Sequence, residues 1–486
     1  MNKKALYLCL LAGLMACSGT VQVNKNLDVL PEIFPDYARV TIPVNIAPLN
    51  FELKNSCDEA RALFTCGSET ITVQAKKGSF MIPASKWKNL LQLAAGKKIT
   101  VTVQAKVDGE WMGYAPFQMD VANEPVDAWL AYRLIEPGYE LWNRMGIYQR
   151  NLENYTEDAI IENKVSGNNC VNCHSFCMHN PEKMLFHMRE TYPCTILIDG
   201  DRVEKLNTKT EQTISPLVYP SWHPSGKYIA FSVNQTKQSF HMNDKNRIEV
   251  FDSASDVVVY DVERHEIVTT PLLSSREAFE TFPTFAPDGK TLYFCTAEAR
   301  PMPKEYDQVK YSLCSVSFDP STRSFGTEID TLYNAVSDKR SASFPRVSPD
   351  GNYLLYTLSG YGNFSIWHKD ADLYMVDLES KQSYPLENVN SNDVESYHSW
   401  SSNSRWIVFS SRRIDGLYTR PFFAYIDENG QAHKPFLLPQ KETDFYFRFM
   451  KSYNIPEFIT GKVKTKGRVL GLKAKEDKGI NVKFAN

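Results

Sequence analysis

The sequence predicts a mainly β protein in which a small β-sandwich-like domain at residues 37–122 precedes a β-propeller at residues 127–460. Two observations lead to this fold class. Apolar and polar residues alternate strictly near residue 100, and a turn-and-strand motif recurs through the second half of the chain. The composition agrees, because 43 % hydrophobic and 12 % aromatic residues exclude a disordered or fibrous chain. We favour six blades, with five as the alternative.

The first residues have the pattern of an export signal. Two lysines precede an apolar run over residues 5–13 that is too short to span a bilayer. The run ends in Leu-Met-Ala-Cys17, which resembles a bacterial lipobox whose cysteine becomes the lipidated first residue. We expect a lipoprotein signal peptide at residues 1–16 and a tether at 17–36. No acidic run follows Cys17, which favours an outer-membrane lipoprotein facing the periplasm, with surface exposure as the alternative.

The first domain has strong strand signals and one helix signal. Residues 99–107 alternate between apolar and polar side chains, and the Asp-Gly pair at 108–109 is a hairpin turn signal. We expect a helix capped by Ser85, running over residues 86–95 and ended by Gly96. Nothing in this domain points to chemistry, so we interpret it as a spacer or packing module.

The second domain is defined by a repeat. Each copy has a tight turn of the Pro-Asp-Gly-Lys type, in which proline fixes φ and glycine supplies a positive φ, followed by an apolar strand. The copies lie at residues 219–232, 282–295, 344–357 and 397–410. A second strand later in each unit, such as residues 256–261, completes the pattern of a propeller blade.

A fainter copy precedes these four. Residues 180–183 take the place of the turn and residues 184–189 that of the strand. Together these repeats resemble the TolB-like Pro-Asp propeller family over residues 127–460. The resemblance implies a propeller, often six-bladed, but little about activity, since propellers have many functions.

The segment Cys170-Val-Asn-Cys173-His174 carries the strongest chemical signal. In a chain of this composition, the number of C-x-x-C-H patterns expected by chance is far below one. It resembles the haem-attachment motif of cytochromes c. The resemblance implies that Cys170 and Cys173 attach one haem c covalently and that His174 is the proximal iron ligand. We expect the motif to form an insert in a blade.

Two simpler interpretations of this segment stay open. Cys170 and Cys173 could form a local disulfide or a thiol redox pair. Alternatively, both cysteines could bind zinc with His174 and His179, although a second C-x-x-C or a regular histidine pair is missing.

A haem used in electron transfer would need a sixth ligand. The candidates near the motif are Met178, His179, Met184, His187 and Met188. We rank His187 first, because it takes the place of a core aromatic residue in later repeats, and Met188 second. Strand alternation places these two residues on opposite faces of the strand.

Ten cysteines are present, and six of them remain after the signal peptide, the lipid anchor and the motif are set aside. Sequence neighbours suggest three disulfides, although six cysteines allow 15 pairings. The candidate pairs are Cys57 with Cys66, Cys177 with Cys194, and Cys295 with Cys314.

The functional prediction is an anchored, exported propeller carrying one haem, used in electron transfer or redox sensing with an envelope or redox partner. The alternative is a non-enzymatic TolB-like envelope scaffold with a Cys170–Cys173 disulfide. A metal-assisted polysaccharide lyase using His223 and His398 has low weight, because these residues differ in repeat position. The net charge of −3 argues against nucleic acid as a partner. Residues 461–486 carry a net charge of +6 and are expected to be a solvated basic tail.

Overall fold

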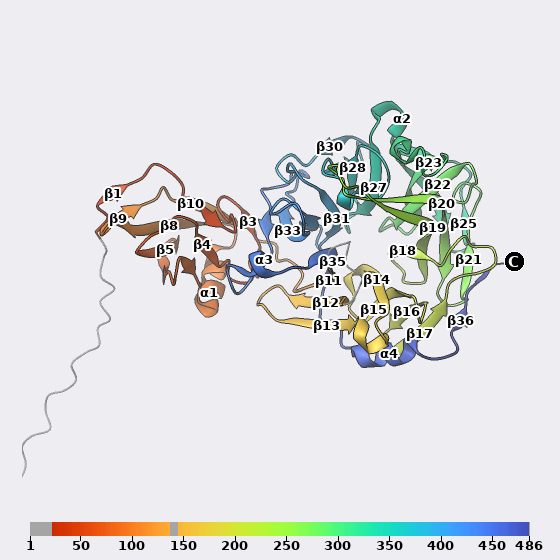
Figure 1. The fold of residues 1–486 in the computed structure, drawn as a ribbon, viewed down its shortest axis with the longest axis horizontal. Helices are drawn as coiled ribbons and strands as arrows, with labels where there is room; N and C mark the ends of the chain where they lie inside the picture. Colours follow the sequence, from red (N-terminus) through yellow and green to blue (C-terminus); the bar gives the residue numbers. More distant parts are fainter. Residues whose placement is uncertain (1–21, 137–143, 486) are drawn as a thin grey trace, which may run out of the picture.

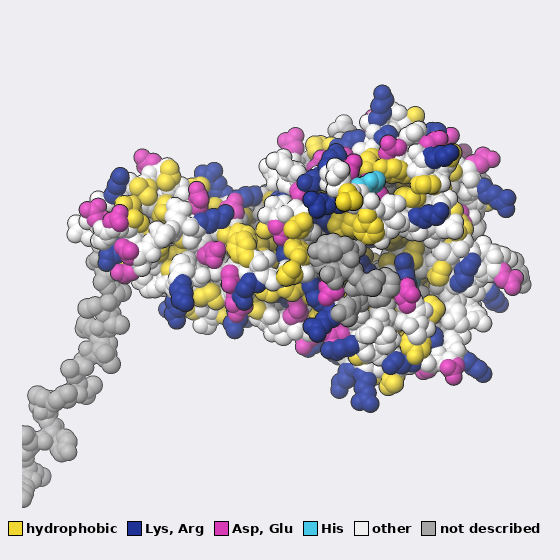
Figure 2. Space-filling model, viewed as in Figure 1, with side chains coloured by type: hydrophobic (Ala, Val, Ile, Leu, Met, Phe, Trp, Pro, Cys, Tyr) yellow, Lys and Arg dark blue, Asp and Glu magenta, His cyan; other side chains and the backbone are white. Residues whose placement is uncertain are grey.

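The computed structural model describes residues 22–136 and 144–485, which form a smaller and a larger β body (Figure 1). The signal peptide and Cys17 lie outside the described residues. The mainly β fold class is confirmed. Acidic, basic and hydrophobic side chains are interspersed over the face seen in Figure 2. No helix among the described residues is long and apolar enough to cross a membrane.

The smaller body contains two sheets and one helix. The larger sheet has the order β1 (Lys25–Asn26), β9 (Glu110–Gly113), β8 (Lys98–Val107), β10 (Phe117–Val121), β3 (Thr41–Ile42), with β5 (Glu59–Cys66) paired to β8 and to β6 (Glu69–Gln74). The second sheet has the order β2 (Ile33–Phe34), β4 (Phe51–Leu53), β7 (Ser79–Phe80). The strands predicted by alternation are present, because their apolar positions face a common core.

The helix α1 spans Ala84–Ala94, so its start differs from the prediction. Pro83 is the N-cap residue and makes no side-chain cap, while Ser85 lies inside the first turn. Proline at a helix start is favoured by its fixed φ and its missing N–H. Gly96, at φ +68°, follows the helix closely, as expected.

Six sheets of four or five strands make up the larger body within the described ranges, arranged around a common centre (Figure 1). In the second to sixth sheets the strands follow the chain from the centre outward. The second to fourth sheets contain β14 (Cys170–Phe176), β15 (Lys183–Arg189), β16 (Cys194–Asp199), β17 (Arg202–Asn207); β18 (Val218–Trp222), β19 (Tyr228–Phe240), β20 (Ile248–Asp261), β21 (Glu266–Val268); and β22 (Ala278–Phe285), β23 (Thr291–Glu298), β24 (Ser312–Asp319), β25 (Ser324–Phe325), β26 (Asp330–Tyr333). The fifth and sixth contain β27 (Ser341–Val347), β28 (Tyr353–Ser359), β29 (Asp372–Asp377), β30 (Ser383–Pro385); and β31 (Glu395–Trp400), β32 (Trp406–Ser411), β33 (Arg420–Tyr425), β34 (Phe436–Leu437).

The first sheet is built from both ends of the repeat region. Its order is β13 (Glu157–Glu162), β12 (Gly146–Asn151), β11 (Trp129–Ile135), β35 (Ser452–Ile459). The late strand β35 pairs antiparallel with the early strand β11, with Leu130 opposite Phe458. This pairing closes the ring, because it leaves no open edge between the first and last units of the propeller.

The basic C-terminal segment is ordered, which corrects the prediction of a solvated tail. It forms α4 (Gly467–Ala474), β36 (Ile480–Asn481) and β37 (Lys483–Phe484). The two strands pair in parallel with the outer strands β17 and β21. Its buried apolar side chains, Leu470 among them, join the clusters of the second and third sheets. The prediction of a solvated tail relied on the net charge of the segment and did not consider its apolar residues.

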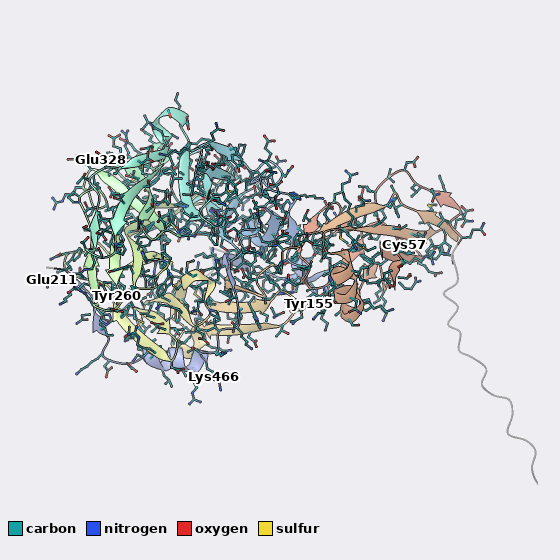
Figure 3. The ribbon with its side chains drawn as sticks, turned by 180° about the vertical axis from the view of Figure 1, so that it is seen from behind. Cys57, Tyr155, Glu211, Tyr260, Glu328 and Lys466 are labelled. Carbon is teal, nitrogen blue, oxygen red and sulfur yellow. The ribbon has the colours of Figure 1, made fainter. Side chains whose placement is uncertain are left out.

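The two bodies share one hydrophobic cluster, which includes Trp87 and Val101 of the smaller body and Trp406 and Phe423 of the larger. Hydrogen bonds also cross the junction. Tyr155, labelled at this junction in Figure 3, donates to the Pro48 carbonyl at 2.7 Å. The smaller body is therefore packed firmly against the propeller.

Candidate functional site

The C-x-x-C-H motif forms the innermost strand of the second sheet, β14, and is therefore not an insert. Its ladder with β15 is interrupted between Asn172 and Ser175. At this interruption Cys173 has a φ of 50°, a left-handed conformation that is unusual outside glycine. The irregularity is a β-bulge, which redirects the side chains that follow it.

The same bulge occurs once in each of the six sheets. The inner strand of every sheet has a residue with φ between 47° and 51° at a break in the ladder. These residues are Cys173, Tyr219, Phe282, Phe344, Tyr397 and Ile455. In four sheets proline follows this residue, and in the second and sixth sheets His174 and His398 follow it. The motif thus occupies a standard repeat position with unusual residues.

These inner strands surround a partly open cavity of about 170 Å³, which we call the funnel. Its wall is mainly aromatic side chains and prolines, including Pro224, Pro287 and Pro349 of the repeat turns. Cys173 and His174 line it together with a few other polar groups. An apolar cavity with a few polar groups is the usual form of a ligand site.

Neither ring nitrogen of His174 makes a hydrogen bond of good geometry, although the residue is only 2 % exposed and the Ile455 backbone lies beside the ring. Burial, with the nearby positive charge of Arg133, lowers its pKa to about 3. The imidazole is therefore neutral at physiological pH, which is the form that binds a metal ion. A buried imidazole without partners is costly unless a ligand satisfies it.

Both thiols of the motif are buried. Burial is also the main cause that raises the pKa of Cys170, and the charge of nearby Cys173 adds to the effect. A buried thiol with a raised pKa is a poor nucleophile, which argues against a catalytic redox pair. Among the described residues, no group of three or more His, Cys, Asp or Glu side chains is placed to hold a metal ion, so the zinc interpretation gains no support.

His187, ranked first as the sixth ligand, does not line the funnel that His174 lines. His174 lies beside Phe176, with ring centroids 6.1 Å apart. His187 instead lies 5.9 Å from Phe231 of the third sheet and hydrogen bonds with Thr195 at 2.7 Å. The second choice, Met188, packs in the apolar cluster that contains Phe176 and does not line the funnel.

Met178 and His179 do line the funnel, beside Cys173 and His174. His179 hydrogen bonds through Nδ1 with the Phe458 carbonyl at 3.0 Å. A carbonyl on one ring nitrogen is typical of metal-ligating histidines, because it orients the other nitrogen. Both residues were candidates because they lie close to the motif in the sequence. The sequence alone did not show that the turn after β14 lies in the funnel wall.

The six remaining cysteines are free thiols in the structure, so the predicted disulfides are corrected. Cys177 and Cys194 pack in different hydrophobic clusters. Cys295 and Cys314 are offset by one residue in the register of β23 and β24, so that they point to opposite faces.

The third pair is separated by an extended strand. Cys57 lies two residues before β5 and Cys66 ends it, so their Cα atoms are roughly 20 Å or more apart. A disulfide requires less than about 7 Å. Pairing the cysteines by closeness in sequence was wrong, because an extended strand separates two cysteines along its length or places them on opposite faces of the sheet.

The two histidines of the low-weight lyase hypothesis are held by backbone contacts. His223 hydrogen bonds with the Gly289 carbonyl at 2.8 Å, and His398 with the Leu355 carbonyl at 3.0 Å. His398 lines the funnel, whereas His223 is not among its lining residues. The structure therefore does not unite them in one site.

Comparisons with known proteins give neither a family nor a curated relative. No family model and no curated protein matches the chain. Solved structures similar to it include an oligogalacturonate lyase in complex with manganese (14 % identity, 69 % of this chain and 87 % of that chain, TM-score 0.34). Others are prolyl oligopeptidase B from Galerina marginata (11 %, 63 % and 44 %, TM-score 0.36) and the tricorn protease (9 %, 69 % and 33 %, TM-score 0.26). All three are propeller-type proteins, and nothing of their activities is carried over to this chain.

Proposed function

We propose that the protein is an exported, membrane-anchored propeller protein that carries one c-type haem at its funnel and acts in electron transfer or haem-linked redox sensing. The observation that carries the proposal is His174, a buried imidazole without a hydrogen bond of good geometry, beside Cys173 in the funnel wall. When bound, haem would supply a one-electron iron centre.

The chain would hold this group through Cys170, Cys173 and His174, with His179, which lines the funnel, as the second ligand. A cavity of about 170 Å³ is smaller than the ~300–1,000 Å³ of pockets that enclose a ligand. The funnel would therefore surround only part of a macrocycle. The buried, neutral His174 is suited to permanent ligation, because protonation does not compete with the metal ion.

The test is a visible spectrum of the full chain exported from a host with a c-type haem maturation system. We expect a Soret band that survives acid–acetone extraction, and we expect Cys173→Ser to lose it. Cys314→Ser is the matched control, since Cys314 is also a buried thiol on a propeller strand. The proposal is supported if the wild type and Cys314→Ser carry covalent haem and Cys173→Ser does not.

The alternative is an envelope scaffold in which Cys170 and Cys173 form a structural disulfide. Both thiols are buried and, like the other six, free in the structure, so this alternative rests on their C-x-x-C spacing. The same preparation distinguishes the two functions. A Cys170–Cys173 linked peptide in non-reduced mass spectra, without a Soret band, would overturn the haem proposal.

A further inference from the structure

A second hollow, which we call the rim pocket, lies at the other end of the sheets. It measures about 420 Å³, and its described lining comes mainly from the connections that follow β19, β28 and β32, with Asp393 added from the connection that precedes β31. The funnel is lined instead by the inner strands and by the turns between first and second strands. Because consecutive strands are antiparallel, these two sets of connections lie at opposite ends of each sheet.

Arg412 is a buried cation in the wall of the rim pocket. It is 7 % exposed, and its guanidinium lies 3.6 Å from the ring centroid of Trp367. Among the described residues its side chain makes no hydrogen bond and no ion pair, and its Nε is buried without a partner. Burial lowers its pKa to about 10.

The neighbouring arginine shows what a structural arginine looks like in this sheet. Arg413 donates to Glu395 at 2.8 Å, to the Val389 carbonyl at 2.5 Å and to Ser411 at 3.1 Å. Arg412 has no such contacts, although burying an unpaired charge is strongly unfavourable. The charges of Asp393 and Asp415 act on Arg412 through space, but neither carboxylate forms an ion pair with it within the described residues. Asp415 instead lies 3.8 Å from Arg420 and caps two backbone N–H groups.

The rest of the pocket is positively charged and partly apolar. Lys245, Arg247 and Lys369 join Arg412 against two aspartates, which leaves an excess of two positive charges on the described lining. Leu417 is 58 % exposed there and Phe240 is 60 % exposed. The pocket also contains a second buried nitrogen without a partner, Nε2 of His241.

We propose that the rim pocket binds a small organic carboxylate, whose carboxylate group pairs with Arg412 and whose apolar body rests on Phe240 and Leu417. The planar guanidinium fork matches a carboxylate in a bidentate geometry. The volume lies within the range of small-molecule sites. This site is independent of the proposed haem, because it uses none of the funnel residues.

The experiment measures binding of benzoate, benzamide and inorganic phosphate to the full chain by calorimetry. We expect benzoate to bind the wild type, and Arg412→Gln and the neutral benzamide each to weaken binding at least ~10-fold, the value of one charge-assisted hydrogen bond. Arg276→Gln, a change to an exposed arginine outside the pocket, should leave binding unchanged. Absence of benzoate binding at millimolar concentration, equal affinity for benzamide, or tighter binding of phosphate would overturn the proposal.

A second variant separates a binding role from a structural one. Replacing a buried, unpaired cation by an apolar side chain of similar size should not destabilise the ligand-free protein. We therefore expect Arg412→Met to keep or raise the melting temperature while it abolishes benzoate binding. A large fall in melting temperature would show that Arg412 supports the fold and would overturn its assignment as a ligand group.

Discussion

At the scale of single residues, the inner strands combine a fixed backbone with variable side chains. A bulge residue with left-handed backbone recurs in all six sheets. Cys173 has nearly the same φ as Phe282 and Phe344 at this position. The residue after it is proline in four sheets, and His174 and His398 distinguish the second and sixth sheets from these four.

The choice of sixth ligand gives a prediction at this scale. In haem-loaded protein, His179→Ala should change the spectrum towards a high-spin form, because His179 lines the funnel with an oriented ring. His187→Ala is the matched control and should leave the spectrum unchanged, since His187 faces the third sheet. Absorption and electron paramagnetic resonance spectra measure both, and the reverse pattern would contradict the assignment.

Glu280 predicts a pH dependence of stability. Burial, followed by repulsion from Asp256, raises the pKa of Glu280 to about 8. Its folded-state pKa exceeds that of the unfolded chain, so the stabilising contribution is complete at acidic pH and is lost as the pH rises towards 8. We expect the wild-type free energy of unfolding to fall by roughly 3–5 kcal/mol between about pH 5 and pH 8.

Chemical denaturation of Glu280→Gln should give a flatter profile over this range. The control is Glu277→Gln, because Glu277 is exposed on the same segment. Parallel profiles for wild type and Glu280→Gln would show that the carboxyl group does not titrate in this way. Burial also raises the pKa of Asp256, so its titration lowers the free energy of unfolding in the same direction as the pH rises.

At the scale of elements, the C-terminal segment acts as a strap on the outer strands of two sheets. Outer strands expose unpaired backbone groups, and β36 and β37 cover part of that edge. Lys205 fixes the end of α4, since its Nζ donates to the Ala474 carbonyl at 2.8 Å. The strap therefore protects the propeller from pairing with other chains.

Helix α4 contains a matched pair of leucines that tests this role. Leu470 is fully buried, whereas Leu472 is 59 % exposed. We expect Leu470→Ala to lower the free energy of unfolding by about 2–4 kcal/mol, the usual cost of emptying a buried leucine site. Leu472→Ala should change it by less than about 0.5 kcal/mol. Urea denaturation gives both values, and equal effects would refute the packing of α4.

The sequence predicted the elements better than their contacts. Alternation and the repeated turn gave the strands, because these signals are local. The disulfides, the free tail and the place of His187 were wrong, since each depends on which face of a strand meets which neighbour. The rim pocket was missed as well, because Arg412 becomes unusual only when its missing partners are seen.

At the scale of the whole molecule, the two bodies form one packed unit. Their common cluster joins residues nearly 400 positions apart, as in the hydrogen bond from Tyr37 to the Leu437 carbonyl. The smaller body was interpreted as a spacer, yet it packs on the sixth sheet through Trp406, whose Nε1 donates to the Glu124 carbonyl. The apolar surface of the sixth sheet therefore belongs to both bodies.

The pairing of β35 with β11 also sets the order of events during synthesis. A ribosome delivers β11 some 320 residues before its partner, so the first sheet waits with one edge open while the other five are made. At ~5–20 residues per second, translation of these residues takes roughly 16–64 seconds. Export in an unfolded state would remove this interval, because the whole chain could then fold at once on the far side of the membrane.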